Sequence, residues 1–130
     1  MVNDTISDLL TRIRNAILAN HQIVKVPKSN KAYAILKVLY REKLIQSIRP
    51  VSISGKDFLL VILSSPKQKV KISKLKRISK PSVRVYKKYK DIPTVLGGFG
   101  LALISTSKGI LTDMEARQQR LGGEILCFIW

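Results

Sequence analysis

The part of this sequence best suited to chemistry is a short run of hydroxyl side chains that ends in a lysine and a glycine. The run consists of Ser105, Thr106, Ser107, Lys108 and Gly109, and it follows an apolar stretch that predicts a buried strand. Hydroxyl groups at the end of a strand can hydrogen-bond to the 2′-hydroxyls, phosphate oxygens and base edges of RNA, and a glycine lets the backbone turn close to a ligand. The residues alone therefore indicate either an RNA-binding loop or an ordinary polar loop.

The same run has the Ser-x-x-Lys spacing of the penicillin-recognising serine acyl-transferases, in which the lysine activates the serine nucleophile. Here the pair would be Ser105 and Lys108. Neither the Ser-Asp-Asn nor the Lys-Thr-Gly motif accompanies it, and 130 residues are too few for that fold. An acyl-transferase is thus a remote alternative.

Other combinations that could support catalysis or metal binding are incomplete. Asp113 and Glu115 lie two apart on a predicted helix, so their carboxylates face different directions. His21 and Cys127 are the only residues of their kinds, too few for a zinc site, and Cys127 is expected to pack as a small apolar group. We therefore expect a protein that is not an enzyme and that uses no metal, cofactor or small-molecule substrate.

The charge of the chain indicates a polyanionic partner. There are 24 Lys and Arg against 8 Asp and Glu, which gives a net charge of +16 and a pI near 10.4. Nucleic acid is the leading candidate. An anionic membrane surface would also attract such a charge, but no stretch reaches the roughly 18 apolar residues of a spanning helix. A basic protein-interaction module, or one that binds nucleic acid without specificity, is the alternative.

Residues 67–90 concentrate this charge, with nine Lys, two Arg and no acid, and with Tyr86 and Tyr89 among them. A solvated lysine-rich face is the plain interpretation of such a run. Alternation around Val83 and Val85 instead favours strands that present Arg84 and Tyr86 to solvent. Tyr86 would then either stack on a base or sugar, or fill an ordinary sheet face.

The first half of the chain predicts an αβαββ order. A helix is expected from Thr5 to Ala19, with Asp8 as its capping-box acid. A second helix would be capped by Ser29 or Asn30. The strands are expected at residues 23–26, 45–53 and 58–63, the last two joined by a turn at residues 54–57.

The second half predicts a mostly β arrangement, so the fold class is α+β. The expected domains are residues 1–65 and 66–130, separated near Ser64-Ser65-Pro66. The strands are expected at residues 70–78, 83–86, 99–104 and 124–130, with a short helix at 113–119 before the last strand. Gly122 and Gly123 would end that helix with a positive φ, and residues 97–100 would form a turn.

Several short motifs occur in order along the chain. They are Asp4-Thr5-Ile6, residues 10–16, Arg77-Ile78-Ser79-Lys80-Pro81, Arg84-Val85-Tyr86, Ile92-Pro93, residues 95–98, residues 105–109, Thr112-Asp113, Glu115-Ala116-Arg117 and residues 122–127. Together they resemble the S8 family of small-subunit ribosomal proteins, over most of the chain. Ordered matches of this kind are much harder to obtain by chance than one motif.

The resemblance implies a protein that binds the central domain of small-subunit rRNA, helps assemble the subunit platform and contacts neighbouring proteins, including number five of that subunit. It implies that an irregular RNA helix with displaced bases is read by Ser105, Thr106, Ser107, Lys108 and Glu124, with Tyr86, Arg84 and Lys87 alongside. It also implies a secondary RNA contact formed by Asp4, Thr5, Arg12, Arg14, Asn15, Ser29 and Lys31. Without the resemblance, the basic residues of the first helix could equally be a solvated face.

The chain departs from the family pattern at a few positions. Thr5 replaces the usual proline, Met114 replaces a common arginine, and Lys43 and Ser82 replace glycines, which leaves the second helix without its usual glycine cap. The first residues and the ending Glu124 to Trp130 resemble plastid and cyanobacterial members. With no signal peptide and one cysteine, a reducing compartment is expected: the chloroplast or, alternatively, the bacterial cytoplasm.

Overall fold

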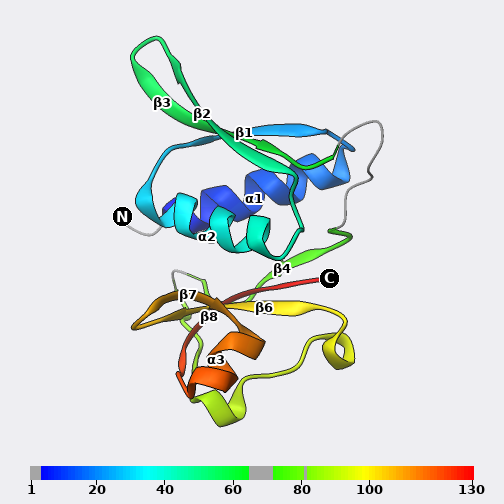
Figure 1. The fold of residues 1–130 in the computed structure, drawn as a ribbon, viewed down its shortest axis with the longest axis vertical. Coiled ribbons are helices and arrows are strands. Elements are labelled where there is room, and N and C mark those ends of the chain that lie inside the picture. The colour runs from blue at the N-terminus through cyan, green and yellow to red at the C-terminus, as the bar shows by residue number, and fades with distance from the viewer. Residues whose placement is uncertain (1–3, 65–71, 81) are drawn as a thin grey trace. The chain divides into compact units, whose positions relative to one another are not determined.

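Figure 1 shows the structure, a computed structural model that describes residues 4–64, 72–80 and 82–130. The chain forms two compact units, Met1–Ser73 and Lys74–Trp130, and each unit contains one sheet. The domain boundary predicted between residues 65 and 66 lies outside the described residues. Helices and antiparallel sheets together give the α+β fold that the sequence predicts.

The N-terminal unit has the predicted αβαββ order. Its antiparallel sheet has the strand order β1-β3-β2, and Figure 1 shows both helices on one side of it. The apolar stripe predicted for the first helix supplies Leu9, Leu10 and Ile13 to the core. The elements are α1 (Asp4–Leu18), β1 (Ile23–Pro27), α2 (Asn30–Arg41), β2 (Ser47–Ile53) and β3 (Lys56–Ile62).

The capping box predicted for α1 is wrong. Because α1 begins at Asp4, Thr5 lies within the first turn and does not cap the helix. Asp8 instead accepts a hydrogen bond of 2.9 Å from Nε of Arg12, four residues on. For α2 the prediction holds, since Oγ of Ser29 accepts from the N–H of Ala32 at 3.1 Å.

Two turns of this unit use left-handed backbone. After α2, Lys43 adopts φ +62° and its N–H donates to the carbonyl of Tyr40 at 3.0 Å, so the lysine takes the conformation for which glycine is favoured. Between β2 and β3, Ser54 and Gly55 both have positive φ, the pattern of a two-residue type I′ hairpin. The predicted turn is therefore confirmed, but β3 begins two residues earlier than expected.

The C-terminal unit is mostly β, with a short helix before the last strand, as predicted. Its sheet has the order β4-β8-β6-β7, and β5 also pairs with β8. The elements are β4 (Leu75–Arg77), β5 (Tyr86–Lys87), the 3₁₀ turns η1 (Tyr89–Asp91) and η2 (Leu96–Gly98), β6 (Leu101–Thr106), β7 (Gly109–Thr112), α3 (Asp113–Gln119) and β8 (Gly123–Ile129).

Some strand predictions in this unit are wrong. The strand predicted at 83–86 begins only at Tyr86, because Lys80 and Val83 exchange two backbone hydrogen bonds of 2.8 and 3.0 Å and form a turn there. The strand predicted from Phe99 begins at Leu101, after the turn made by η2. Of the strand predicted at 70–78, residues 70 and 71 lie outside the described residues and the rest forms only β4. The sequence analysis missed β7.

The role predicted for Gly122 and Gly123, to end α3 with a positive φ, is wrong. These glycines are needed at the start of β8 instead. α3 ends at Gln119 and is capped by Arg120, which itself has φ +56°, and neither Gly122 nor Gly123 has a positive φ. A Cβ on Gly122 would lie 2.6 Å from the carbonyl oxygen of Lys87, and one on Gly123 would lie 2.1 Å from that of Ser105. Both glycines therefore allow close approach of backbones, where β8 enters the sheet beside β5 and β6.

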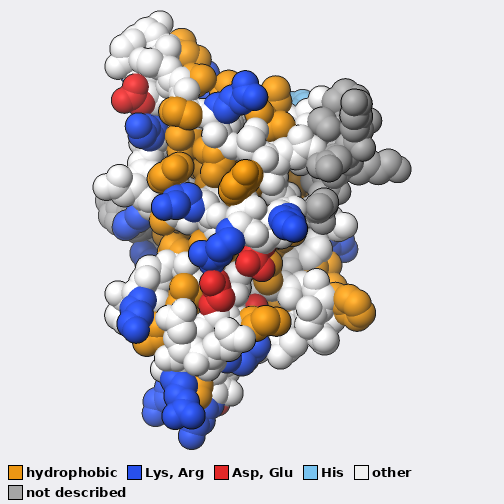
Figure 2. Space-filling model, viewed as in Figure 1, with side chains coloured by type: hydrophobic (Ala, Val, Ile, Leu, Met, Phe, Trp, Pro, Cys, Tyr) orange, Lys and Arg blue, Asp and Glu red, His pale blue; other side chains and the backbone are white. Residues whose placement is uncertain are grey.

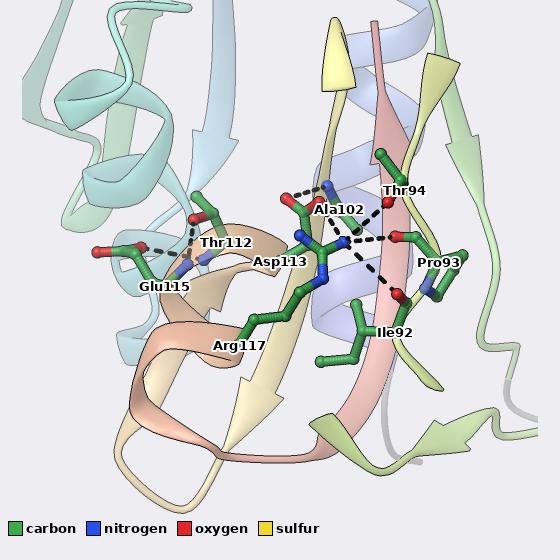
Figure 3. A network of polar contacts seen from close by, with 8 residues as sticks. All are labelled: Ile92, Pro93, Thr94, Ala102, Thr112, Asp113, Glu115 and Arg117. Atoms are coloured by element: carbon green, nitrogen blue, oxygen red, sulfur yellow. Dashed lines mark hydrogen bonds and ion pairs between the residues drawn. The ribbon is translucent and has the colours of Figure 1, made fainter. Parts of the chain in front are cut away.

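A polar network fixes the base of β6 (Figure 3). Asp113, at the start of α3, accepts from the N–H of Ala102 at 3.3 Å and pairs with Nη2 of Arg117 at 3.0 Å. Arg117 also donates to the carbonyl of Pro93 at 3.1 Å. The same elements share an apolar core, formed by Ile92, Val95, Ala102, Ile104, Ala116 and Ile125. The network and this core thus hold α3 and the segment before η2 against β6, the strand that leads into the loop at 105–109.

Candidate nucleic-acid interface

Three residues of the predicted site face the same side of the sheet. β8 lies between β6 and β5 at its start, with Ser105 opposite Glu124 on one side and Tyr86 opposite Glu124 on the other. Directly opposite residues of antiparallel strands project from the same face. The strand that leads into the hydroxyl loop, β6, is therefore paired directly with the last strand, β8.

The β6–β7 hairpin presents the remaining hydroxyls at its tip. Ser107 and Lys108 form the exposed turn, and Gly109 follows with φ +106°. Oγ1 of Thr106 donates to the carbonyl of Gly109 at 2.8 Å and accepts from the N–H of Lys108 at 3.2 Å, so this hydroxyl holds the turn in shape. Within the described chain, the hydroxyls of Ser105 and Ser107 have no hydrogen-bond partner. These two hydroxyls are therefore free to hydrogen-bond to solvent or to a ligand.

Glu124 is not a solitary acid on this face. Its Oε2 lies 3.0 Å from Nη1 of Arg84, and the side chains are 13% and 35% exposed, respectively. The pair neutralises the carboxylate that would otherwise repel a phosphate backbone. Glu124 is thereby positioned as an acceptor among Ser105, Tyr86 and Arg84, which the sequence analysis assigned to one RNA contact.

Tyr86 and Lys87 lie at the surface. The side chain of Tyr86 is 66% exposed, so it does not fill the interior of the sheet, and Lys87 is exposed next to it on β5. An exposed ring beside cations is suited to stacking on a base or sugar. A place on an ordinary exposed sheet face fits the same exposure, so the stacking role of Tyr86 stays a prediction.

The residues predicted for the secondary contact are only partly brought together. Thr5 and Ser29 line one cleft of about 360 Å³ in the N-terminal unit, together with Asp8 and Lys28, which the sequence analysis missed. Asp4 is the first residue of α1, and Lys31 is exposed on the first turn of α2.

The other members lie farther along α1. Arg12 is bound to Asp8 and also donates to the carbonyl of Lys25 at 3.1 Å. Asn15 is exposed, whereas Arg14 is half-buried. Arg12 and Asn15 are thus both exposed, and the guanidinium of Arg12 is held by Asp8 and by the carbonyl of Lys25.

A second cleft, in the C-terminal unit, was not predicted. It is formed by residues 86–90 together with Gly122 and Gly123. The lysine run with its interleaved tyrosines was visible in the sequence. The sequence of the run does not reveal that β5 pairs with the start of β8, which brings residues 86–90 beside Gly122 and Gly123.

Two kinds of feature are not found among the described residues. None of the helices there is long and apolar enough to cross a membrane. Nor do three or more His, Cys, Asp or Glu side chains gather in that part of the chain as a metal site would require. Lys and Arg side chains are spread over the face drawn in Figure 2, where acidic side chains are few.

Comparison with known proteins gives matches over the whole chain. The family profile described as "Ribosomal protein S8" matches residues 4–130. The "Small ribosomal subunit protein uS8c" of Gracilaria tenuistipitata var. liui and that of Guillardia theta are each 52% identical to this chain, with 100% of both chains covered. The "Small ribosomal subunit protein uS8" of Nostoc punctiforme is 50% identical, with 98% of each chain covered.

Proposed function

Because the chain belongs to the ribosomal protein S8 family, whose members are structural and not enzymatic constituents of the small ribosomal subunit, we propose that it is a primary rRNA-binding protein. It binds the central domain of the small-subunit rRNA and helps assemble the subunit platform. The observation that supports this most is the placement of Ser105, Glu124 and Tyr86 on three adjacent strands beside the tip at Ser107.

This surface suits an irregular RNA helix better than a regular one. In a regular A-form helix the major groove is too narrow for side chains and the shallow minor groove is recognised mostly by shape, so hydroxyls that read particular bases need bases displaced from the stack. The hydroxyls of Ser105 and Ser107 donate or accept as the RNA requires, whereas Glu124 accepts from a base amino group. Tyr86 offers a ring face, and Arg84, Lys87 and Lys108 supply cations for phosphates.

The N-terminal unit provides a second, smaller contact. The cleft lined by Thr5 and Ser29 has polar groups at the start of α1 and at the cap of α2. Oγ of Ser29 accepts from the helix, and its hydrogen remains able to donate to a phosphate or a 2′-hydroxyl. Lys31 adds a cation on the same helix end.

The setting of this function is the plastid ribosome. Relatives that bear the plastid-type name uS8c, from Gracilaria and Guillardia, match the full length of the chain, which supports a chloroplast location. The uS8 proteins of Nostoc and of other bacteria support the bacterial cytoplasm as the alternative. Neighbouring small-subunit proteins, including number five, are the expected protein partners.

The proposal is tested by filter binding of the full chain to a central-domain rRNA fragment and to an unrelated structured RNA, each over a range of salt concentrations. Affinity for the fragment should fall log-linearly with salt, with a slope that implies about five or more phosphate contacts, and should exceed that for the unrelated RNA at every concentration. A flat response to salt would favour a protein-interaction module. Equal affinity for both RNAs would favour a nonspecific binder.

A further inference from the structure

The cleft formed by residues 86–90 has a volume of about 860 Å³. One wall consists of the end of β5 and the 3₁₀ turn η1, and the start of β8 lies against them. Three lysines and two tyrosines line this wall, and among the described residues none of those that line the cleft carries a carboxylate. The lysines suit an anionic ligand, and the tyrosine rings suit a ligand that also has flat apolar surfaces.

The base of the cleft is bare backbone. A Cβ on Gly122 would lie 2.6 Å from the carbonyl oxygen of Lys87 and 2.9 Å from Cα of Lys88, so the two segments pack together without an intervening side chain. Because no side chain rises from Gly122 or Gly123, the wall formed by residues 86–90 stays open to a ligand.

The side chains of the wall differ in how firmly they are held. Tyr89 is half-buried and packs against the apolar core that includes Ile92, which fixes its position. Nζ of Lys90 lies 5.9 Å from the centre of the Tyr89 ring. Lys87 and Lys88 are exposed, and in Figure 2 Lys and Arg side chains gather over the end of the unit where Figure 1 places the chain around η1. A fixed aromatic ring among mobile ammonium groups is the arrangement found in surfaces that bind single-stranded nucleic acid.

We propose that this cleft binds an unpaired RNA segment that continues from the helix recognised at Ser105 and Glu124, with phosphates on Lys88 and Lys90 and a base against Tyr86 or Tyr89. This inference rests on the function proposed above. Continuity favours RNA over an acidic segment of a neighbouring protein, because Tyr86 lines the cleft and also lies directly opposite Glu124. A strand that leaves the recognised helix thus enters the cleft at Tyr86.

The first test measures the affinity of the full chain for two RNAs: the central-domain helix with its natural unpaired flanking nucleotides, and the same helix trimmed of them. The double variant Lys88→Ala/Lys90→Ala should bind the flanked RNA about ten-fold more weakly, with a salt slope reduced by about one and a half. It should bind the trimmed RNA no worse than the charge-matched control Lys37→Ala/Lys56→Ala, whose lysines are exposed in the N-terminal unit. Equal losses on both RNAs, or losses no larger than the control's, would overturn the proposal.

The second test locates the RNA directly. The sequence has one cysteine, Cys127, and it is buried, so Lys90→Cys provides an accessible thiol for a photoreactive crosslinker. In assembled small subunits the crosslinks should map to unpaired nucleotides that flank the recognised helix, whereas Lys56→Cys should not reach them. Crosslinks to a neighbouring protein instead of RNA would show that an acidic protein segment occupies the cleft.

The two proposals fail in different ways. If the cleft does not bind RNA but the proposed function is right, the wild-type chain still prefers the trimmed helix over an unrelated RNA, and Ser107→Ala still removes that preference. If the proposed function itself is wrong, the wild-type chain shows no preference for either central-domain RNA.

Discussion

Arg84 and Glu124 lie 40 residues apart in the sequence and form an ion pair of 3.0 Å. The pair joins the lysine-rich segment to β8, and in the sheet Glu124 stands between Ser105 on β6 and Tyr86 on β5. This relationship places one acceptor at the centre of a surface that otherwise carries cations and hydroxyls.

The first prediction concerns the sign of the effect of Glu124→Gln. The change keeps the shape of the side chain but removes the charged acceptor and the ion pair, so binding to the central-domain RNA should weaken about ten-fold or more. The melting temperature should change little, because the Gln amide oxygen still accepts from Nη1 of Arg84, whose side chain is 35% exposed. Quantitative filter binding and thermal melting are the measurements.

Glu42→Gln is the control for that variant, since Glu42 is an exposed acid of the N-terminal unit. Removing a bystander acid tightens binding to a polyanion slightly, and this is expected for Glu42→Gln. The same tightening in Glu124→Gln would mean that Glu124 takes no part in recognition.

The second prediction is that Gly123→Ala damages both stability and RNA binding. Its Cβ would meet the carbonyl oxygen of Ser105 at 2.1 Å, so β8 must move away from β6 or the strand must distort, at a cost of about 1–3 kcal/mol. Urea unfolding and RNA affinity should both report the change.

Gly97→Ala provides a comparison for Gly123→Ala. Unlike Gly123, Gly97 has a left-handed backbone, with φ +62°, and nothing lies within 4 Å of an added Cβ. This variant should cost about 1 kcal/mol of stability and leave RNA affinity unchanged. A Gly123→Ala protein with wild-type RNA affinity would contradict the role assigned to the β6–β8 contact.

A third prediction follows from the left-handed lysine after α2. A non-glycine residue in this conformation costs about 1–2 kcal/mol, and the greater freedom of glycine in the unfolded chain offsets part of the gain. Lys43→Gly should therefore raise the free energy of unfolding by about 0.5–1 kcal/mol, measured by urea denaturation. Lys37→Gly, inside α2, should lower it by about 1 kcal/mol, and a loss of stability in Lys43→Gly would contradict this account.

Features of the fold could be predicted from the sequence where the residues that cause them are close together in the chain. The helix at 113–119 and the αβαββ order were predicted because apolar spacing and turn residues lie within a few positions of one another. Gly122 and Gly123 were misjudged for the opposite reason. Next to a helix end they indicate a positive φ, but their role comes from Lys87 and Ser105, which are distant in the sequence.

The candidate site shows the same division. The hydroxyl run and the lysine run could be recognised from their residue types alone. Their connection with Glu124 was predicted from the family resemblance. Sequence alone did not show that the hydroxyl of Thr106 hydrogen-bonds within the turn, that Arg84 pairs with Glu124, or that residues 86–90 form a cleft. Val83 illustrates a local failure, because its alternation with Val85 resembles a strand, although the chain forms a turn at Lys80 and Val83.

A fourth prediction separates affinity from selectivity. Lys74, Lys76 and Lys80 are exposed and lie in the basic segment away from the hydroxyl hairpin in sequence. The triple variant with alanine at these positions should weaken cognate and unrelated RNA to similar extents, because phosphate contacts carry little sequence information. The ratio of the two affinities, measured by filter binding, should stay constant, and selective loss of the cognate RNA would show that these lysines read the site.

The most direct test of the central claim, that the hairpin and Glu124 act as one recognition surface, is the affinity of Ser107→Ala for cognate and unrelated RNA. Removing the hydroxyl leaves an RNA polar group unpaired in a desolvated interface, at a cost of about 1–3 kcal/mol. Cognate binding should weaken about ten-fold or more, while unrelated RNA, the melting temperature and the matched variant Ser52→Ala stay close to wild type. Cognate binding that is unchanged in Ser107→Ala, or reduced only in step with unrelated RNA, would contradict the account.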